Sequence, residues 1–218
     1  MTARTLRAAM SVAPRLAARL ALAAAAAALF VGCSLSRPSP VKAMFLLEPA
    51  SPPVAAKAQP ATLRVGTVNV AAPFRGRAFV YRDSELRYVS DFYAEFLVAP
   101  GPMVGEATAR ALDRAGVFAR VVPPGAPPDG DYVLDGFVGA LYGDGRDAGK
   151  PAAEVAVTYY LSRADIGNAT PFWSKEYRRR VAVAGPVPEG YAAALSAATG
   201  EILAELAKDL ATVDLPKK

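Results

Sequence analysis

Two segments of the chain repeat their apolar residues at the spacing of an amphipathic helix. Residues 102–115 place apolar side chains on one helical face, and Gly116 follows at the usual place of a C-cap glycine. Residues 189–213 carry a longer stripe: Tyr191, Leu195, Ala198, Ile202, Leu206 and Leu210. Gly200 lies inside this segment, where glycine costs roughly 0.5–1 kcal/mol relative to alanine, so we expect a close contact there. The pattern predicts two main helices.

Elsewhere the apolar positions alternate or form short runs, as they do in β-strands. The predicted strands are 44–47, 63–70, 79–82, 86–89, 117–122, 131–142, 153–161 and 172–183. Strands 79–82 and 86–89 are expected to form one hairpin, and 153–161 and 172–183 a second. In 63–70 the apolar positions change phase, which predicts a β-bulge or burial on both faces.

The elements follow the order strands, helix, strands, helix. That order predicts a single α/β (α+β) domain with a mixed β-sheet packed with two main helices. We place this domain at residues 44–213 and a C-terminal tail at 214–218. Residues 49–60, rich in proline and alanine, are expected to form a loop, and 92–98 either a strand or the approach to the first helix.

The first 32 residues have the pattern of a secretory signal peptide. Four arginines precede an uninterrupted run of 13 apolar or glycine residues from Leu20 to Gly32. A membrane-spanning helix needs roughly 20 apolar residues, so an uncleaved anchor is the weaker alternative. We therefore predict residues 1–32 to be removed by cleavage between Gly32 and Cys33.

Cys33 is the only cysteine of the chain. The residues from Leu29 to Ser34 resemble a bacterial lipobox, although Phe30 stands where leucine is preferred. We predict that Cys33 carries diacylglycerol and an N-acyl chain, the alternative being a free thiol. Because at least two acyl chains hold a protein firmly at a membrane, this modification would suffice as an anchor. Ser34, in place of aspartate, favours the periplasmic face of the outer membrane.

Residues 33–43 are predicted to be a tether between the lipid and the domain. Its nine residues from Ser34 to Lys42 span at most ~30 Å, so the folded part must stay close to the membrane. The net charge of the whole chain is +5. Removing the four arginines of the predicted signal peptide leaves 21 basic and 20 acidic residues, a net charge of +1. The charge therefore gives no argument for nucleic-acid binding.

The composition argues against catalysis. The chain has no histidine, and its one cysteine is expected to be lipidated. We find no signature of a serine hydrolase, a phosphate loop or a β-lactamase-type site, so we expect no enzyme, cofactor or metal. The segment 143–147 has two aspartates but lacks the oxygen ligands and closing glutamate of a calcium loop. A hydrolase stays the least supported alternative.

Several segments together resemble the ABC-type transport auxiliary lipoproteins, which include the lipoprotein of the paraquat-inducible membrane-integrity operon. The residues that carry the resemblance are Phe45–Leu47, Phe79–Arg82, Leu86–Tyr88, Phe92–Phe96, Pro100, Leu112 and Ala115–Phe118, together with the lipobox. Phe96 departs from the tryptophan usual near that position. The resemblance spans most of residues 44–210.

The resemblance implies an auxiliary lipoprotein that works with an inner-membrane transporter and a mammalian-cell-entry-type periplasmic component. Such systems move phospholipids or similar apolar molecules between membranes, and the lipoprotein would dock the periplasmic component. Direct phospholipid binding and homo-oligomers remain open. Two other hypotheses are a periplasmic lipid-binding carrier and an activator of an envelope enzyme.

The candidate contact residues are two groups of side chains. Tyr81 and Arg82 lie in the segment that carries the resemblance, and Arg178, Arg179 and Arg180 form the densest charge run. Each group is expected either to contact a partner or lipid headgroup, or to serve the fold as core and surface residues. A further aromatic group, Trp173 with Tyr159 and Tyr177, is expected to pack across neighbouring strands rather than to face lipid.

Overall fold

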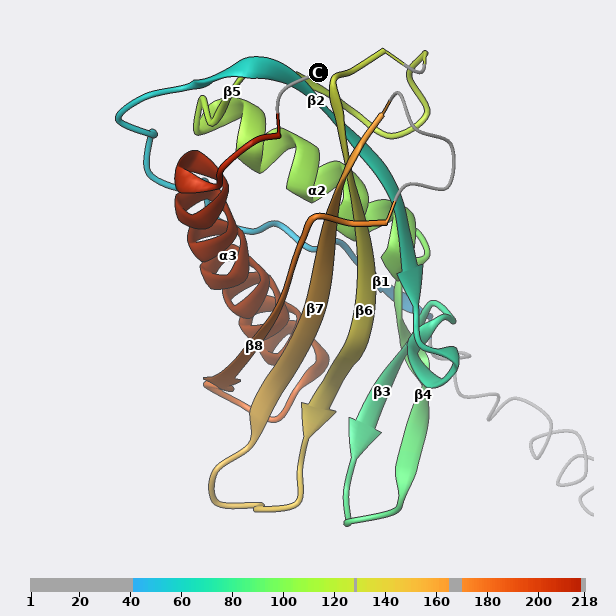
Figure 1. Ribbon diagram of the computed structural model, residues 1–218. Helices are drawn as coiled ribbons and strands as arrows, with labels where there is room; N and C mark the ends of the chain where they lie inside the picture. The colour runs from blue at the N-terminus through green and yellow to red at the C-terminus, as the bar shows by residue number, and fades with distance from the viewer. Residues whose placement is uncertain (1–40, 128, 165–169, 217–218) are drawn as a thin grey trace, which may run out of the picture. The chain divides into compact units, whose positions relative to one another are not determined.

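The computed structural model describes residues 41–127, 129–164 and 170–216 (Figure 1). The signal peptide, Gly32 and Cys33, most of the tether and the last two residues lie outside these ranges, so their predicted roles stay predictions. Residues 41–218 form one compact unit. The labels used below are those of Figure 1.

An eight-stranded sheet and two helices make up the unit, as the sequence pattern predicts. The strands are β1 (Ala43–Phe45), β2 (Gln59–Val70), β3 (Ala78–Arg82), β4 (Tyr88–Phe96), β5 (Phe118–Val122), β6 (Tyr132–Asp144), β7 (Ala152–Arg163) and β8 (Trp173–Ala182). The helices are α2 (Pro100–Arg114) and α3 (Pro188–Thr212), and a short 3-10 turn η2 (Ala72–Phe74) follows β2. The fold is therefore α+β with a mixed sheet.

Strand β6 organises the sheet because it pairs along both of its edges. One edge pairs antiparallel with β7, which in turn pairs antiparallel with the edge strand β8. The other edge pairs in parallel first with β2, over residues 132–138, and then with β3, over residues 143–144. The antiparallel hairpin of β3 and β4 is thus attached at the C-terminal end of β6, where Figure 1 shows it projecting beside the β6–β7 turn.

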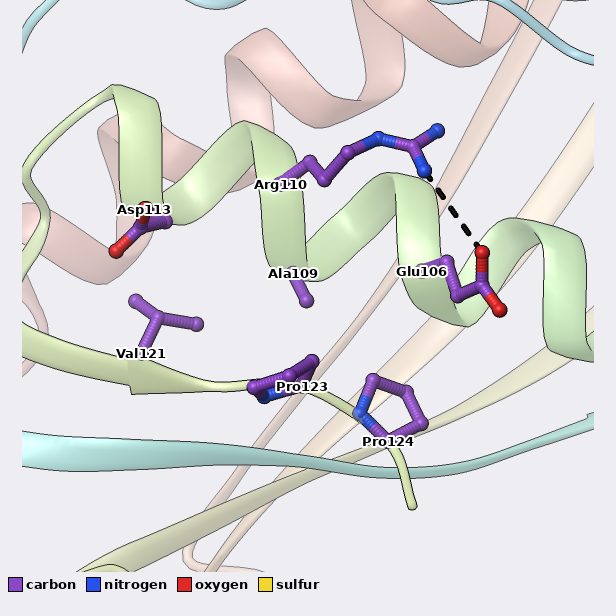
Figure 2. A pocket seen from close by; sticks show the side chains of 7 residues that line it. All are labelled: Glu106, Ala109, Arg110, Asp113, Val121, Pro123 and Pro124. Carbon is purple, nitrogen blue, oxygen red and sulfur yellow. Dashed lines mark ion pairs between the residues drawn. The ribbon is translucent and has the colours of Figure 1, made fainter. Parts of the chain in front are cut away.

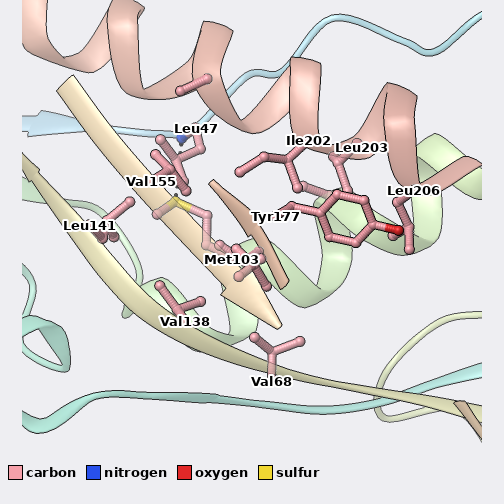
Figure 3. Close-up of a cluster of buried hydrophobic side chains, with 14 of the residues drawn as sticks. Leu47, Val68, Met103, Val138, Leu141, Val155, Tyr177, Ile202, Leu203 and Leu206 are labelled. Atoms are coloured by element: carbon pink, nitrogen blue, oxygen red, sulfur yellow. Dashed lines mark hydrogen bonds between the residues drawn. The ribbon is translucent and has the colours of Figure 1, made fainter. Parts of the chain in front are cut away.

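The two helices pack side by side on one face of the sheet (Figure 1). Helix α2 lies over β2 and β5, and α3 lies over β7 and β8. The core between helices and sheet includes Leu47, Met103, Val138, Val155, Ile202 and Leu206 (Figure 3). The predicted stripe of α3 is buried along its whole length.

Two predicted glycines serve the helices in different ways, one by permitting a close approach and one by its backbone conformation. A Cβ at Gly200 would lie 3.1 Å from the backbone nitrogen of Ala50, which confirms the predicted close contact of α3, here with the loop after β1. Gly116 has a φ of 61° and ends α2 in the left-handed conformation expected of a C-cap glycine.

Two strand boundaries differ from the predictions. Strand β2 begins at Gln59, inside the predicted loop, because Gln59 pairs with β5 and its side-chain amide donates to the carbonyl of Val213, 2.9 Å away, beyond the end of α3. Strand β4 is continuous from Tyr88 to Phe96, so the predicted strand 86–89 and the segment 92–98 belong largely to one strand. The predicted bulge in β2 is confirmed by a register shift between Val65 and Val68.

Candidate interaction surface

The β3–β4 hairpin exposes apolar side chains at its tip. Leu86 is 95% exposed at the turn, and Tyr88 and Val89 at the start of β4 are more than one-third exposed. These three residues are called the hairpin-tip surface below. Because Tyr88 and Val89 are consecutive residues of a paired strand, they expose apolar area on opposite faces of the tip. Exposed apolar area of this kind is typical of interaction surfaces.

The turn beneath Leu86 is held by polar contacts. The Arg87 guanidinium donates to the Asp83 carboxylate at 2.8 Å, and the Arg87 backbone N–H donates to the Ser84 hydroxyl at 3.2 Å. Glu85 accepts from Arg146, which follows β6, at 2.7 Å. The apolar tip is therefore displayed on a turn that is tied both internally and to the main sheet.

Tyr81 and Arg82 shape the hairpin from within. The Tyr81 ring packs against Tyr191 of α3 at 4.9 Å, and its hydroxyl donates to Asp91 at 3.0 Å. Burial, and then this hydrogen bond, raise the pKa of Tyr81 above its ordinary value. The Arg82 guanidinium lies 5.6 Å from the Tyr88 ring centroid and donates to the carbonyl of Glu85 at 2.8 Å. Both side chains thus position the tip rather than point freely away from it.

Arg178, Arg179 and Arg180 lie on the edge strand β8, and each is engaged by carboxylates. Arg178 pairs with Glu154 at 2.5 Å and with Glu176 at 3.1 Å. Arg179 pairs with Glu201 and Glu205 of α3. Arg180 pairs with Asp144 at the end of β6. The structure therefore brings this run into ion pairs with neighbouring elements, and it is linked to Arg82 only indirectly, through Asp144, Arg146 and Glu85.

Asp144 lies at the centre of these ion pairs and is fully buried. Its carboxylate accepts from Nε and Nη2 of Arg146 at 3.0 and 2.8 Å and also from Arg180. The Arg146 guanidinium, followed by Arg180, holds the pKa of Asp144 well below its ordinary value against the opposing effect of burial. No local pattern predicts this contact, since Arg180 lies 36 residues further along the chain.

A contact of 3.8 Å between Arg180 and Glu154 makes these ion pairs continuous. Four arginines and four acids form this network: Arg82, Arg146, Arg178 and Arg180 with Glu85, Asp144, Glu154 and Glu176. The opposite charges balance in number. A phosphate headgroup would have to compete with carboxylates that already bind these guanidiniums. A lipid-headgroup role for Arg178–Arg180 remains a prediction, and their observed contacts join β6, β7 and β8 to the hairpin turn.

A second apolar surface lies where β1 pairs with the C-terminal half of β4. We call it the β1–β4 edge surface, and its residues are Met44, Leu46, Phe92, Tyr93, Leu97 and Val98, between 42% and 72% exposed. The Lys42 ammonium lies 5.4 Å from the Phe92 ring centroid and 3.5 Å from the Glu95 carboxylate, which Arg77 also binds. The sequence marks these residues only as strand, because exposure depends on what covers the strand.

The surface has shallow hollows as well. One, of about 360 Å³, lies between α2 and the end of β5. Figure 2 shows Pro123 and Pro124 on one side of it and the Glu106–Arg110 ion pair running along α2. A second, of about 350 Å³, lies between α3 and the loop at Pro53–Ala56 and is lined mostly by alanine. The second is the more apolar and so resembles a lipid site more closely.

Across residues 41–127, 129–164 and 170–216, no group of acidic, histidine or cysteine side chains is arranged to bind a metal ion. Within the same residues, neither helix combines the length and apolar character needed to cross a bilayer. The predicted aromatic packing is confirmed for Tyr159 and Tyr177, whose ring centroids are 6.2 Å apart on adjacent strands.

Comparison with known proteins identifies the fold but no sequence family. No protein-family model matches the chain, and no curated protein sequence matches it. Protein XCC0632 from Xanthomonas campestris, described as a DUF330 protein, has a similar structure with a TM-score of 0.68 at 18% identity, over 76% of this chain and 92% of that one. An uncharacterized protein gives a TM-score of 0.60 at 14% identity, over 78% and 99%.

The matches also include lipoprotein GNA1162 from Neisseria meningitidis, with a TM-score of 0.37 at 14% identity over 71% of this chain and 100% of that one. A similarity that low supports no inference about this chain. The chain therefore shares its fold with a DUF330 protein, and membership in the ABC-type transport auxiliary lipoproteins stays a prediction.

Proposed function

We propose that this protein is a non-catalytic lipoprotein of the cell envelope that docks the mammalian-cell-entry-type periplasmic component of an ABC-type lipid transport system. It would be anchored by acyl chains on Cys33 at the periplasmic face of the outer membrane. The lipobox-like residues and the family resemblance support this assignment. The similarity to a DUF330 protein is in keeping with it at the level of fold.

The observation that carries the docking role is the hairpin-tip surface. Leu86, Tyr88 and Val89 are exposed on a turn held by three sets of polar contacts, so little conformational freedom would be lost when a partner covers them. Full burial of one such side chain contributes about 1.5–3 kcal/mol. Interfaces typically depend on a few apolar or aromatic residues of this kind.

The test is capture of the transport component from detergent-solubilised envelopes by the tagged lipoprotein. Substituting Leu86→Ser together with Val89→Ser should reduce capture at least tenfold, since the pair removes exposed apolar area from the turn and from β4. Phe137→Ser is the matched control, because Phe137 is also exposed but lies in β6 between β2 and β7. Equal capture by both variants would exclude the hairpin tip, and recovery of only a cell-wall enzyme would favour the activator hypothesis.

A second candidate function is that of a lipid-binding carrier. The apolar hollow beside α3, about 350 Å³, is the observation that favours it. Native mass spectrometry of the mature chain carrying Cys33→Ser would reveal retained phospholipid. If the chain is purified from cells in which phospholipid is abundant and its spectrum shows only the mass of the protein, the carrier hypothesis would be refuted.

A further inference from the structure

The β1–β4 edge surface gathers exposed apolar side chains from β1, from β4 and from the residues that directly follow each strand. Met44 pairs in register with Glu95, and the Leu97 backbone N–H donates to the carbonyl of Phe45 at 2.8 Å. The exposed side chains at Met44 and Leu46 therefore run alongside those at the end of β4. Phe92 is 72% exposed, with its ring 5.0 Å from that of Tyr93.

This surface lies where the chain enters the described domain. Lys42 contacts Phe92 and Glu95, so the position at which residue 42 joins the domain is fixed beside the edge surface. Val41 follows Cys33 by eight positions, and at 3.3–3.6 Å per residue the two Cα atoms are at most ~29 Å apart in any conformation. Acyl chains on Cys33 would therefore keep the edge surface within reach of the bilayer.

The chemistry of the surface suits the headgroup region. Aromatic side chains are favoured at membrane interfaces, and lysine and arginine beside them attract anionic lipids. Lys42 and Arg77 share one carboxylate, Glu95, which leaves a net positive charge in this group. The nearby Asp91 carboxylate accepts hydrogen bonds from the Tyr93 and Ala94 backbone N–H groups and from the Tyr81 hydroxyl; these neutral donors stabilise its negative charge without cancelling it, so the positive charge of this surface is local to Lys42 and Arg77.

We propose that the β1–β4 edge surface rests in the headgroup region of the membrane that holds the lipid anchor. The inference rests on the lipid anchor of the proposed function, and it assigns a face of the domain to the bilayer. Contact is limited to the depth of the headgroups, because the backbone groups of an edge strand cannot enter hydrocarbon unpaired. Two attachments, lipid and surface, then restrict the orientation in which the hairpin tip meets its partner.

The first test labels the intact lipoprotein. With Cys33 modified as a thioether, Phe92→Cys supplies the only free thiol of the chain, which accepts an environment-sensitive dye. In proteoliposomes of phosphatidylethanolamine and phosphatidylglycerol we expect a blue-shifted emission and quenching by headgroup-level nitroxide lipids. The control is Phe137→Cys, which should show neither. Equal emission and quenching at both positions would overturn the proposal, as would a shift at residue 92 that requires an added protein partner.

The second test removes the lipid. The mature chain with Cys33→Ser should still bind the same vesicles weakly, and Phe92→Ser with Tyr93→Ser should lower the partition constant about tenfold or more, given the apolar area lost. Lys42→Gln should weaken binding to anionic but not to neutral vesicles. Partition that the double substitution leaves unchanged would refute the proposal.

The outcomes separate this inference from the proposed function. Binding of the unlipidated chain to vesicles, with no fatty-acid mass on wild-type Cys33, would refute the anchor while leaving an interfacial surface. Loss of partner capture by the Leu86 and Val89 substitutions with an unchanged signal at residue 92 would support both surfaces. Unchanged partner capture with a blue-shifted residue 92 would leave only the membrane contact.

Discussion

Replacing Asp144 by asparagine should destabilise the domain more than any other single change of charge in the network. The side chain is fully buried and accepts from two guanidiniums, those of Arg146 and Arg180. Asparagine has the same shape but presents one oxygen and an NH₂ group that cannot accept. It therefore removes the negative charge and leaves two arginines beside a buried donor.

The magnitude follows from the geometry. Breaking a fully buried ion pair costs about 3–5 kcal/mol, whereas hydrogen bonds to charged groups contribute about 1.5–3 kcal/mol. Arg146 and Arg180 are one-third to two-fifths exposed, so water would rehydrate part of each guanidinium. We expect Asp144→Asn to lower the free energy of unfolding by about 2–4 kcal/mol, or the Tm by about 5–15 °C for a domain of this size.

The assay is urea unfolding of the mature chain with Cys33→Ser, followed by circular dichroism. Asp147→Asn is the control, because Asp147 lies three residues further on in the β6–β7 turn, is exposed and should change stability by less than ~0.5 kcal/mol. The folded pKa of Asp144 is depressed, so its stabilisation is present above about pH 4 and is lost as the pH falls further. The difference between wild type and Asp144→Asn should therefore shrink in acid. A difference below ~0.5 kcal/mol at pH 7 would refute the role assigned to this carboxylate.

Three further predictions concern the core. Gly143→Ala should destabilise by about 1–3 kcal/mol, because its Cβ would lie 2.6 Å from the Tyr191 ring, whereas Gly145→Ala, with 3.8 Å to the nearest atom, should not; thermal unfolding of the pair measures both. Burial raises the pKa of Tyr159 to about 12, so the free energy of unfolding should fall as the pH rises from about 10 to 12. Tyr159→Phe should remove the contribution of this residue to that fall, which urea titrations at several pH values would measure. Ile202→Ala should cost about 2–5 kcal/mol in the same assay, since the side chain is wholly buried.

The helices and most strands could be predicted because each carries its periodicity locally. Helix α3 buries the same six residues that its sequence spacing selects, and β7 buries Val155, Val157, Tyr159 and Leu161 as its alternation indicates. Such patterns arise from contact with one continuous face, so a window of a few residues contains the signal.

The pairing of β6 with two successive partners could not be predicted from the sequence. Nothing local distinguishes a strand edge that pairs only with β2 from one that changes to β3 at residue 143. The projecting hairpin follows from that change, and so does the exposure of Leu86 and Tyr88. Leu86 and Tyr88 are apolar enough for a buried strand. They are exposed because no other element packs over them completely.

The charge run illustrates the same limit from the opposite side. Consecutive arginines in β8 alternate between faces, which the sequence pattern indicates, but their acidic partners come from β6, β7 and α3. In the sequence the three arginines resemble a phosphate-binding site. In the folded protein each is paired with carboxylates.

Side-chain contacts, including the ion-pair network, help to hold the β3–β4 hairpin in position on the sheet. The hairpin is attached to β6 through only two paired residues of β3, so its backbone pairing alone would hold it weakly. Packing of Tyr81 on Tyr191 and the Glu85–Arg146 contact add side-chain connections from α3 and from the β6–β7 turn. If the hairpin carries the docking surface, then Arg146→Ala should reduce partner capture without altering any residue of the hairpin tip. Because that effect arises from lost positioning, it should be smaller than the effect of Leu86→Ser with Val89→Ser. An equal or larger loss, measured with a fold that circular dichroism shows intact, would mean that Arg146 itself contacts the partner.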